Sequence, residues 1–451
     1  MVMSQNIVEN KKAEITQFLQ EIKQDYRIPG MVVTISGKDG IEYLESFGDV
    51  STDDNFIIGS NSKAFTALIV LRLQEKGLLN INEPVVKYLP WFEFKNKEVS
   101  NKITIKNLLH HTSGLSTGIG RIVHKKDENA ERVRLKIIEL LKGVKVDKYP
   151  IKDFDYSSAN YQLLGYIIEN VTNKEYSTVF KEEIADLFEL ENTSSTMPNN
   201  LAQGYQPFLY YSIIPIEPNY NKVNIPMGYL NSNGRDLSKY LCELMKSYNG
   251  DTTSVIGTNI TNELFNPNDE NRSKYALGWY NYTYKSTQVL LHGGIVESFN
   301  SYFIIAPEIE KNIVVLTNHY DNSASPTARG ILSILMDREP TESSRLMYYV
   351  VRSLPFLVLL TLLIFAFILN KWRKNGSPIG ISKKPLPNTL VFIGIVIGLG
   401  WIFYAPSLYE ATIKNVIHVD VTSGLSLILL SIFTVGISII LYFNKSKTNF
   451  A

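Results

Sequence analysis

Ser60 and Lys63 are the residues of this 451-residue chain that most directly suggest covalent chemistry. They stand in "GSNSKAFTAL", at the start of an otherwise apolar stretch that we expect to be a helix. Positions i and i+3 share a helix face, so the Ser60 hydroxyl and the Lys63 amine can meet. A serine becomes a nucleophile only beside a base, and a lysine becomes that base only when burial or a nearby cation lowers its pKa from about 10.4. The apolar residues after Lys63 would supply such burial.

A simpler interpretation of the same two residues stays open. Serine is a common N-cap, so Ser60 could merely begin the helix while Lys63 lies in solvent on its first turn. Which interpretation holds depends on whether other residues can complete a catalytic site. Two other stretches of the chain offer such residues.

Tyr156 lies in "FDYSSANYQLLGYIIE", in a polar turn just before a second amphipathic helix. Its phenol could carry a proton between the nucleophile and a leaving group. A purely structural tyrosine is the alternative.

The second stretch is "LLHGGIVESF", where two glycines end an apolar strand and let a substrate lie along the strand edge. His292 could donate a hydrogen bond or carry charge there. The backbone N–H of Ile295 could join that of Ser60 as an oxyanion hole. The alternative for His292 is a histidine that is hydrogen-bonded at a strand end.

The elements that must position these residues follow from periodicity. We expect a first amphipathic helix over residues 10–26, then two strands joined by the turn "KDG" over residues 30–48. Strand-like runs return over residues 275–284, 287–294, 300–307 and 312–318, before a helix over residues 325–336. The middle of the chain, up to about residue 248, is predicted to form helices and long loops. This predicts an α+β fold in which both ends of the domain form one sheet and a helical region is inserted between them.

Taken together, these motifs resemble in order and spacing the serine β-lactamase and penicillin-binding protein superfamily, whose signature begins Ser-x-x-Lys. The resemblance is strongest to its class C β-lactamase, D-aminopeptidase and esterase branch. It includes "IPGMVVTISGKDG", "GLLNINEPVVKYLP", "ITIKNLLHHTSGL", "PMGYLNSNGRDLSKYL" and "YALGW", and it covers most of residues 15–335. It implies a β-lactamase/transpeptidase-like antiparallel sheet flanked by helices.

The resemblance also implies roles for individual residues. Ser60 matches the acylated nucleophile, Lys63 its partner, and Tyr156 the tyrosine of the family's Tyr-x-Asn element. Gly294 and Ile295 fall on the strand that binds substrate. No metal or organic cofactor is needed, and "HHTSGL", with His110 and His111, looks like a structural turn without a catalytic role.

Two positions depart from the family pattern. Ser158 stands where the family usually has the asparagine that holds an acylamide, and serine offers fewer hydrogen bonds. His292 stands where β-lactamases usually have the lysine of Lys-Thr-Gly, which engages a substrate carboxylate. Both changes weaken a β-lactamase assignment and suit the esterase and peptidase members.

Composition limits the partners. The formal net charge is +1, which gives no indication of nucleic-acid binding. Cys242 is the only cysteine, so an intramolecular disulfide, a pair of cysteine metal ligands and a redox pair are excluded, and we expect a buried thiol that acts as a small hydrophobe.

Three apolar runs follow residue 345: "SLPFLVLLTLLIFAFILN", "NTLVFIGIVIGLGWIFYA" and "GLSLILLSIFTVGISIILYF". Each is long enough with its flanks to cross a bilayer, which predicts a hydrolase domain over residues 1–345 and a membrane domain of three transmembrane helices over residues 346–451. Buried core helices are the alternative. Lys and Arg gather in the loop after the first run and in the tail, which would place the large domain outside the cytoplasm. Because "MVMSQNIVENKKAEITQF" lacks an apolar export signal, we expect a missing or misplaced start.

The sequence therefore predicts a membrane-anchored extracytoplasmic serine hydrolase that acts through an acyl-enzyme on a peptide, amide or ester, including substrates with a D-amino acid. The layout is similar to that of membrane-bound peptidases that remove an N-acyl-D-amino acid, but Ile57 stands where some of these have an acidic residue. A cell-wall D-alanyl carboxypeptidase or esterase, a weak β-lactamase, a β-lactam sensor and a silent binding module are the alternatives. The expected partners are the small substrate and the lipid bilayer, and the oligomeric state is open.

Overall fold

The computed structural model describes residues 2–120, 128–151, 153–208, 211–267, 273–340, 388–407 and 421–443, with scattered positions between 353 and 367 and at 413. The chain divides into two compact units. One comprises Met1–Tyr205 and Ile214–Glu342, and the other comprises Gln206–Ile213 and Ser343–Ala451. The assignment of a hydrolase domain to residues 1–345 and a membrane domain to residues 346–451 stays a prediction.

The centre of the first unit is a six-stranded antiparallel sheet with strand order β2-β1-β10-β9-β8-β7. The strands are β1 (Gly30–Gly37), β2 (Gly40–Gly48), β7 (Tyr280–Tyr284), β8 (Thr287–Val296), β9 (Phe299–Ala306) and β10 (Lys311–Thr317). Strand β1 pairs with β10, so the two ends of the domain meet in the middle of the sheet. The predicted α+β fold, with one sheet built from both ends, is confirmed.

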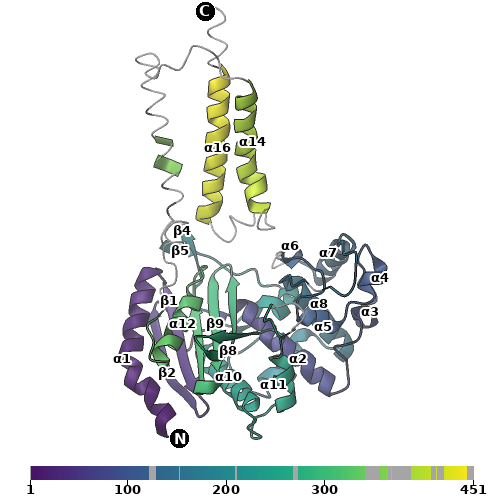
Figure 1. Cartoon of the computed structure of the whole chain (residues 1–451), viewed down its shortest axis with the longest axis vertical. Helices are drawn as coiled ribbons and strands as arrows, with labels where there is room; N and C mark the ends of the chain where they lie inside the picture. Colours follow the sequence, from purple (N-terminus) through teal and green to yellow (C-terminus); the bar gives the residue numbers. More distant parts are fainter. Residues whose placement is uncertain are drawn as a thin grey trace, which may run out of the picture. The chain divides into compact units, whose positions relative to one another are not determined.

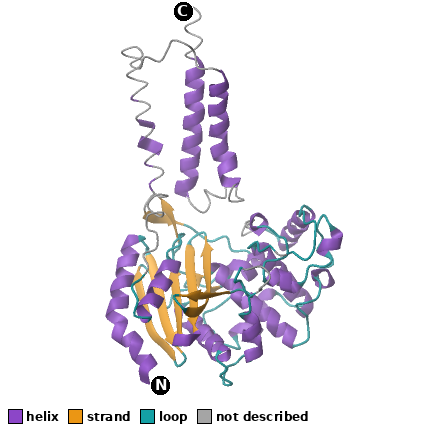
Figure 2. Ribbon diagram, in the orientation of Figure 1, coloured by secondary structure: helices purple, strands orange, loops and turns teal. Residues whose placement is uncertain are grey.

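Helices cover both faces of this sheet (Figures 1 and 2). Helices α1 (Val2–Asp25) and α12 (Ala324–Leu335) contact each other and one face, and α10 (Gly234–Tyr248) packs on the other. Alternation along β1 explains the two contacts: Thr34 meets α10 through Ser238, whereas Ile35 pairs with Tyr43, which meets α1. Because both faces are covered, all eight residues of β1 are buried.

The region between β2 and β7 is mainly helical, as expected. Its α-helices are α2 (Ser62–Glu75), α3 (Val85–Tyr88), α4 (Lys97–Ser100), α5 (Ile105–Leu109), α6 (Thr117–Gly120), α7 (Ala130–Lys142), α8 (Ser158–Thr172), α9 (Tyr176–Phe180), α10 and α11 (Thr258–Leu264). Two short strands, β3 (Phe56–Ile57) and β6 (Asn231–Ser232), pair with each other, and β4 (Tyr205–Phe208) pairs with β5 (Tyr211–Pro215). Single turns of 3₁₀ helix lie at η1 (Gly59–Asn61), η3 (Lys222–Asn224) and η6 (Pro307–Ile309), and π turns at η2 (Lys181–Ala185) and η4 (Ile225–Tyr229).

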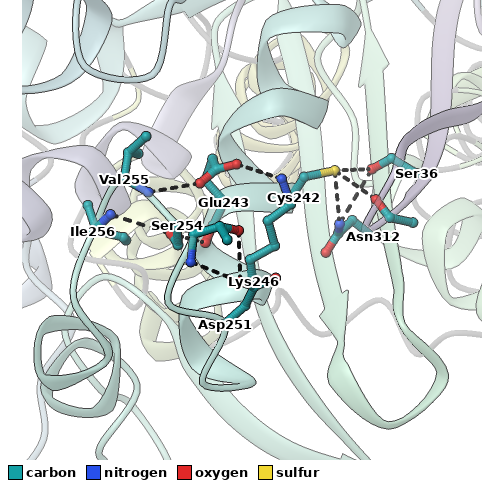
Figure 3. A network of polar contacts seen from close by, with 11 residues as sticks. Ser36, Cys242, Glu243, Lys246, Asp251, Ser254, Val255, Ile256 and Asn312 are labelled. Atoms are coloured by element: carbon teal, nitrogen blue, oxygen red, sulfur yellow. Dashed lines mark hydrogen bonds and ion pairs between the residues drawn. The ribbon is translucent and has the colours of Figure 1, made fainter.

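Cys242 lies between α10 and the sheet, where its buried thiol donates to the carbonyl of Gly37 at 3.0 Å and lies 3.4 Å from the Ser36 hydroxyl (Figure 3). Burial raises the pKa of this thiol, so it stays protonated. The expected buried thiol is confirmed.

The second unit contains α14 (Asn388–Ser407) and α16 (Val421–Phe443), which contact each other and correspond to the second and third apolar runs. Most of the first run lies outside the described residues. A span needs about 20 predominantly apolar residues in one helix. Within the part of the chain that the structure describes, no helix meets the length and apolarity needed to cross a membrane. The prediction of three transmembrane helices therefore has no support from the structure.

Candidate active site

Ser60 lies in a tight turn that is tied to the rest of the domain on both sides. Strand β3 ends at Ile57, and the next backbone N–H, that of Ile58, donates to Leu230 at 3.0 Å. Ser60 then occupies the 3₁₀ turn η1, and the hydroxyl of Ser62 donates to the Gly59 carbonyl while it accepts from the Leu230 N–H. These bonds fix the turn before the helix begins.

Two glycines let this turn approach strand β8. Gly59 has a φ of +55°, and a Cβ there would lie 2.5 Å from the backbone nitrogen of Ile295. A Cβ on Gly294 would lie 2.0 Å from the carbonyl oxygen of Ile58. The backbone around Ser60 and that around Ile295 are therefore in direct contact, as two donors of one oxyanion hole must be.

Lys63 is fully buried in the first turn of α2, with 0 % of its side chain area exposed. Its Nζ lies 3.0 Å from Ser60 Oγ, 3.3 Å from Ser158 Oγ and 2.6 Å from the Met227 carbonyl oxygen. Desolvation lowers the pKa of Lys63 to about 7. A solvated Lys63 beside a capping serine is thus wrong, and Ser60 precedes the α-helix instead of capping it.

Tyr156 stands half-buried just before α8, with the Lys63 ammonium 5.1 Å from the centre of its ring. Burial raises its pKa well above the usual range, and a hydrogen bond with Ser60 only partly opposes this shift. The phenol is therefore protonated at neutral pH. His111 packs on the Tyr156 ring at 4.4 Å between centres and accepts from the Ser157 N–H at 3.2 Å, so it helps to position Tyr156.

His292 is 2 % exposed, and its hydrogen bonds define its state. Nδ1 lies 2.8 Å from the Gly293 carbonyl oxygen, which only accepts, so Nδ1 carries the proton. The Tyr275 hydroxyl lies 3.4 Å from Nε2. Desolvation and the nearby Lys63 lower the pKa of His292 to about 3. A His292 that carries charge or donates to a substrate, as the sequence suggested, does not fit this geometry.

The structure thus brings Ser60, Lys63, Tyr156 and Ser158 together, and strand β8 places Gly294 and Ile295 beside them. Sequence reasoning missed the Met227 carbonyl, which lies on the π turn η4. A backbone carbonyl cannot be recognised from residue type. Only the resemblance of the stretch "PMGYLNSNG" to the family pattern could have indicated that this carbonyl lies in the site. Among the described residues, no group of three His, Cys, Asp or Glu side chains could hold a metal ion.

Comparison with known proteins gives a consistent picture. A sequence model described as "Beta-lactamase" matches residues 15–335. "Protein flp" of Staphylococcus aureus strain MRSA252 is 26% identical over 421 residues, which cover 88% of this chain and 83% of that protein. "Penicillin-binding protein 4*" of Bacillus subtilis strain 168 is 30% identical over a shorter stretch, which covers 39% of this chain and 40% of that protein.

Solved structures share the fold. The octameric penicillin-binding protein homologue from Pyrococcus abyssi has a TM-score of 0.63 and 22% identity, and the match covers 73% of this chain and 78% of that one. A D-stereospecific amidohydrolase from Streptomyces sp. has a TM-score of 0.56 and 21% identity, and the match covers 67% of this chain and 92% of that one. FmtA from Staphylococcus aureus has a TM-score of 0.59 and 23% identity, and the match covers 74% of this chain and 92% of that one.

The close approach of Gly294 to the Ser60 turn can be tested by substitution. In Gly294→Ala the new methyl would meet the Ile58 carbonyl at 2.0 Å, so one backbone must move. We expect the free energy of unfolding to fall by about 1–3 kcal/mol, the usual range for overpacking, in urea unfolding. Gly257→Ala is the control, because no atom lies within 4 Å of its added Cβ. Equal stability of the two variants would contradict the proposed contact.

Proposed function

Because this chain belongs to the beta-lactamase family, we propose that it is a serine hydrolase that forms an acyl-enzyme on Ser60. One observation carries the proposal: a fully buried Lys63 amine lies 3.0 Å from the Ser60 hydroxyl. With its pKa lowered to about 7, this lysine is available as a neutral amine at physiological pH. A neutral amine beside a serine hydroxyl is a general base for nucleophilic attack.

The hydrogen bonds of Lys63 support this role. A neutral amine has two N–H groups and one lone pair. The Met227 carbonyl and the Ser158 hydroxyl can accept the two protons, at 2.6 Å and 3.3 Å. The lone pair is then left for the Ser60 hydroxyl, whose proton Lys63 takes as Ser60 Oγ attacks the substrate carbonyl.

The remaining steps use neighbouring groups. The N–H groups of Ser60 and Ile295 would stabilise the oxyanion of the tetrahedral intermediate. Tyr156 is protonated, so it would act as a relay: its phenol gives a proton to the leaving group and regains one from the Ser60 and Lys63 side. Water then hydrolyses the acyl-enzyme.

We propose peptides, amides or esters as the substrate class, including those with a D-configured residue. The similarity in fold to a D-stereospecific amidohydrolase and the relation to penicillin-binding proteins support this choice. A cell-wall carboxypeptidase, an esterase, a weak β-lactamase or a β-lactam sensor would use the same acylation step. They differ in the acyl donor and in the lifetime of the acyl-enzyme.

The nucleophile can be tested with a fluorophosphonate, which reacts with activated serines by losing fluoride. We expect intact-mass analysis to show one adduct on the wild-type chain and none on Ser60→Ala. Ser46→Ala, which removes an exposed hydroxyl from β2, should react like the wild type. An unreactive wild type, or equal labelling of Ser60→Ala, would reject the proposal. A penicillin adduct of long lifetime would favour a cell-wall or sensor role over a processing hydrolase.

The protonation of Lys63 predicts a pH dependence. Its neutral form is the base, and the lowered pKa makes this form dominant above about pH 7. The rate of fluorophosphonate labelling should therefore fall about tenfold per pH unit below pH 7 and level off above it. Stopped labelling reactions between pH 5 and 9 would measure this, and Lys63→Met should abolish the acylation that depends on this base. A rate that keeps rising to pH 9 would mean that Lys63 titrates normally.

We also propose that the domain works outside the cytoplasm, attached to the membrane through its C-terminal part. This rests on the sequence alone, namely on the apolar runs after residue 345 and on the Lys and Arg residues between them. Leu135→Cys offers a test, because Leu135 is 57% exposed whereas the native Cys242 is buried. A membrane-impermeant maleimide should label this variant on intact cells. Labelling only after lysis would overturn the proposed location.

A further inference from the structure

Four aromatic rings form a row that starts near Ser60. The row runs from Tyr156, which precedes α8, over His292 on β8 to Tyr280 and Tyr282 on β7. Tyr156 and His292 lie 6.2 Å apart between ring centres, with planes inclined by 37°. Tyr280 lies 5.8 Å from His292 at 30°, and Tyr282 lies 5.5 Å from Tyr280 at 12°. Tyr280 and Tyr282 are therefore stacked, the other two pairs are tilted, and each ring is within the distance of aromatic pairing from the next.

Exposure increases from His292 outward to Tyr282, while Tyr156 at the other end of the row is partly exposed. His292 is buried, Tyr156 and Tyr280 are partly exposed, and Tyr282 is 39% exposed. Tyr280 and Tyr282 are two residues apart on β7, so they lie on the same face of that strand. The ring row therefore begins beside Ser60 and ends at the surface of the domain.

The rings offer apolar faces and no positive charge. His292 is neutral, and its one N–H is used by the Gly293 carbonyl, so it has no donor for an anion. Behind it, Tyr275 is fully buried and packs against both His292 and Tyr280. Tyr275 thereby supports the two rings from the protein side. A carboxylate on the substrate would meet aromatic rings here and lose hydration without gaining an ion pair.

We propose that the ring row is a specificity surface, with Tyr280 as its central residue, and that it binds a neutral planar group of the substrate next to the scissile carbonyl. This inference rests on the proposed function, since it assumes that Ser60 is the nucleophile. Recognition would come from stacking on Tyr280 and not from an ion pair.

Boronic acids test the surface directly, because they carry a single substituent. Ser60 Oγ bonds to trigonal boron to give a tetrahedral boronate, and the Ser60 proton passes to Lys63. Methylboronic acid probes the nucleophile alone, phenylboronic acid adds a planar ring, and 3-carboxyphenylboronic acid adds a negative charge. Dissociation constants for the full-length chain would be measured by calorimetry, with butylboronic acid as the non-planar apolar control.

For the wild type we expect phenylboronic acid to bind roughly three- to tenfold more tightly than butylboronic acid, the range that one aromatic pair provides. The 3-carboxyphenyl compound should bind more weakly than the phenyl compound. Tyr280→Ala should remove the preference for the ring without changing the affinity for methylboronic acid, and Tyr280→Phe should retain the preference. Thr283→Ala, an exposed neighbour on β7, is the matched control and should behave as the wild type.

The outcomes separate the two proposals. If methylboronic acid binds equally to the wild type and to Ser60→Ala, or to neither, the nucleophile is wrong and the proposed function fails. If methylboronic acid binds only when Ser60 is present but phenyl, butyl and carboxyphenyl compounds bind alike, the specificity surface alone is rejected. A preference for the carboxyphenyl compound, or a ring preference that survives in Tyr280→Ala, would also overturn it.

Discussion

The burial of Lys63 among neutral oxygens is the constraint on which the site depends. A lysine taken out of water without a carboxylate partner favours its neutral form, because the desolvation of the ammonium is not repaid by an opposite charge. Lys311 shows the usual alternative in the same chain. It is equally buried, at 1% exposure, but its Nζ lies 2.7 Å from a Glu42 oxygen. The partners of Lys63 are two hydroxyls and a carbonyl, so this lysine can act as a base where Lys311 is suited to an ion pair.

This arrangement requires parts of the chain that are distant in sequence. The turn η1 and helix α2 supply Ser60 and Lys63, the first residue of α8 supplies Ser158, and the π turn η4 supplies the Met227 carbonyl. Strand β8 then closes the site from the sheet. Each piece is held by bonds that do not involve the reacting groups, such as that from Thr66 on α2 to the carbonyl of Pro226 at 2.7 Å. The geometry is therefore set before a substrate arrives, which is what electrostatic catalysis needs.

The parts of this structure that follow from local pattern were predictable from the sequence, and the parts that follow from tertiary contact were not. Alternation and turn residues located β1, β2, β8, β9 and β10, and the spacing of Ser60 and Lys63 indicated their contact. The 3₁₀ turn at Ser60 was missed, because it is imposed by contacts of Ile58 and Ser62 with Leu230, which lies far away in sequence. The tautomer of His292 was not predicted, because it depends on the position of one carbonyl. Apolar runs predicted membrane spans, and the described part of the structure does not support them.

Ser158 fits the chemistry of Lys63 in a way that its residue type alone did not suggest. In the proposed mechanism Lys63 changes from an amine with two protons to an ammonium with three as the tetrahedral intermediate forms. The Met227 carbonyl can only accept, so it fixes one N–H in both states. The Ser158 hydroxyl can accept from the lysine in either state while it turns its own proton toward a substrate oxygen. The third position, toward Ser60, is then the only one at which a proton must move. A site built this way needs little rearrangement between the free enzyme and the tetrahedral intermediate, because the change in charge on Lys63 is confined to one hydrogen bond.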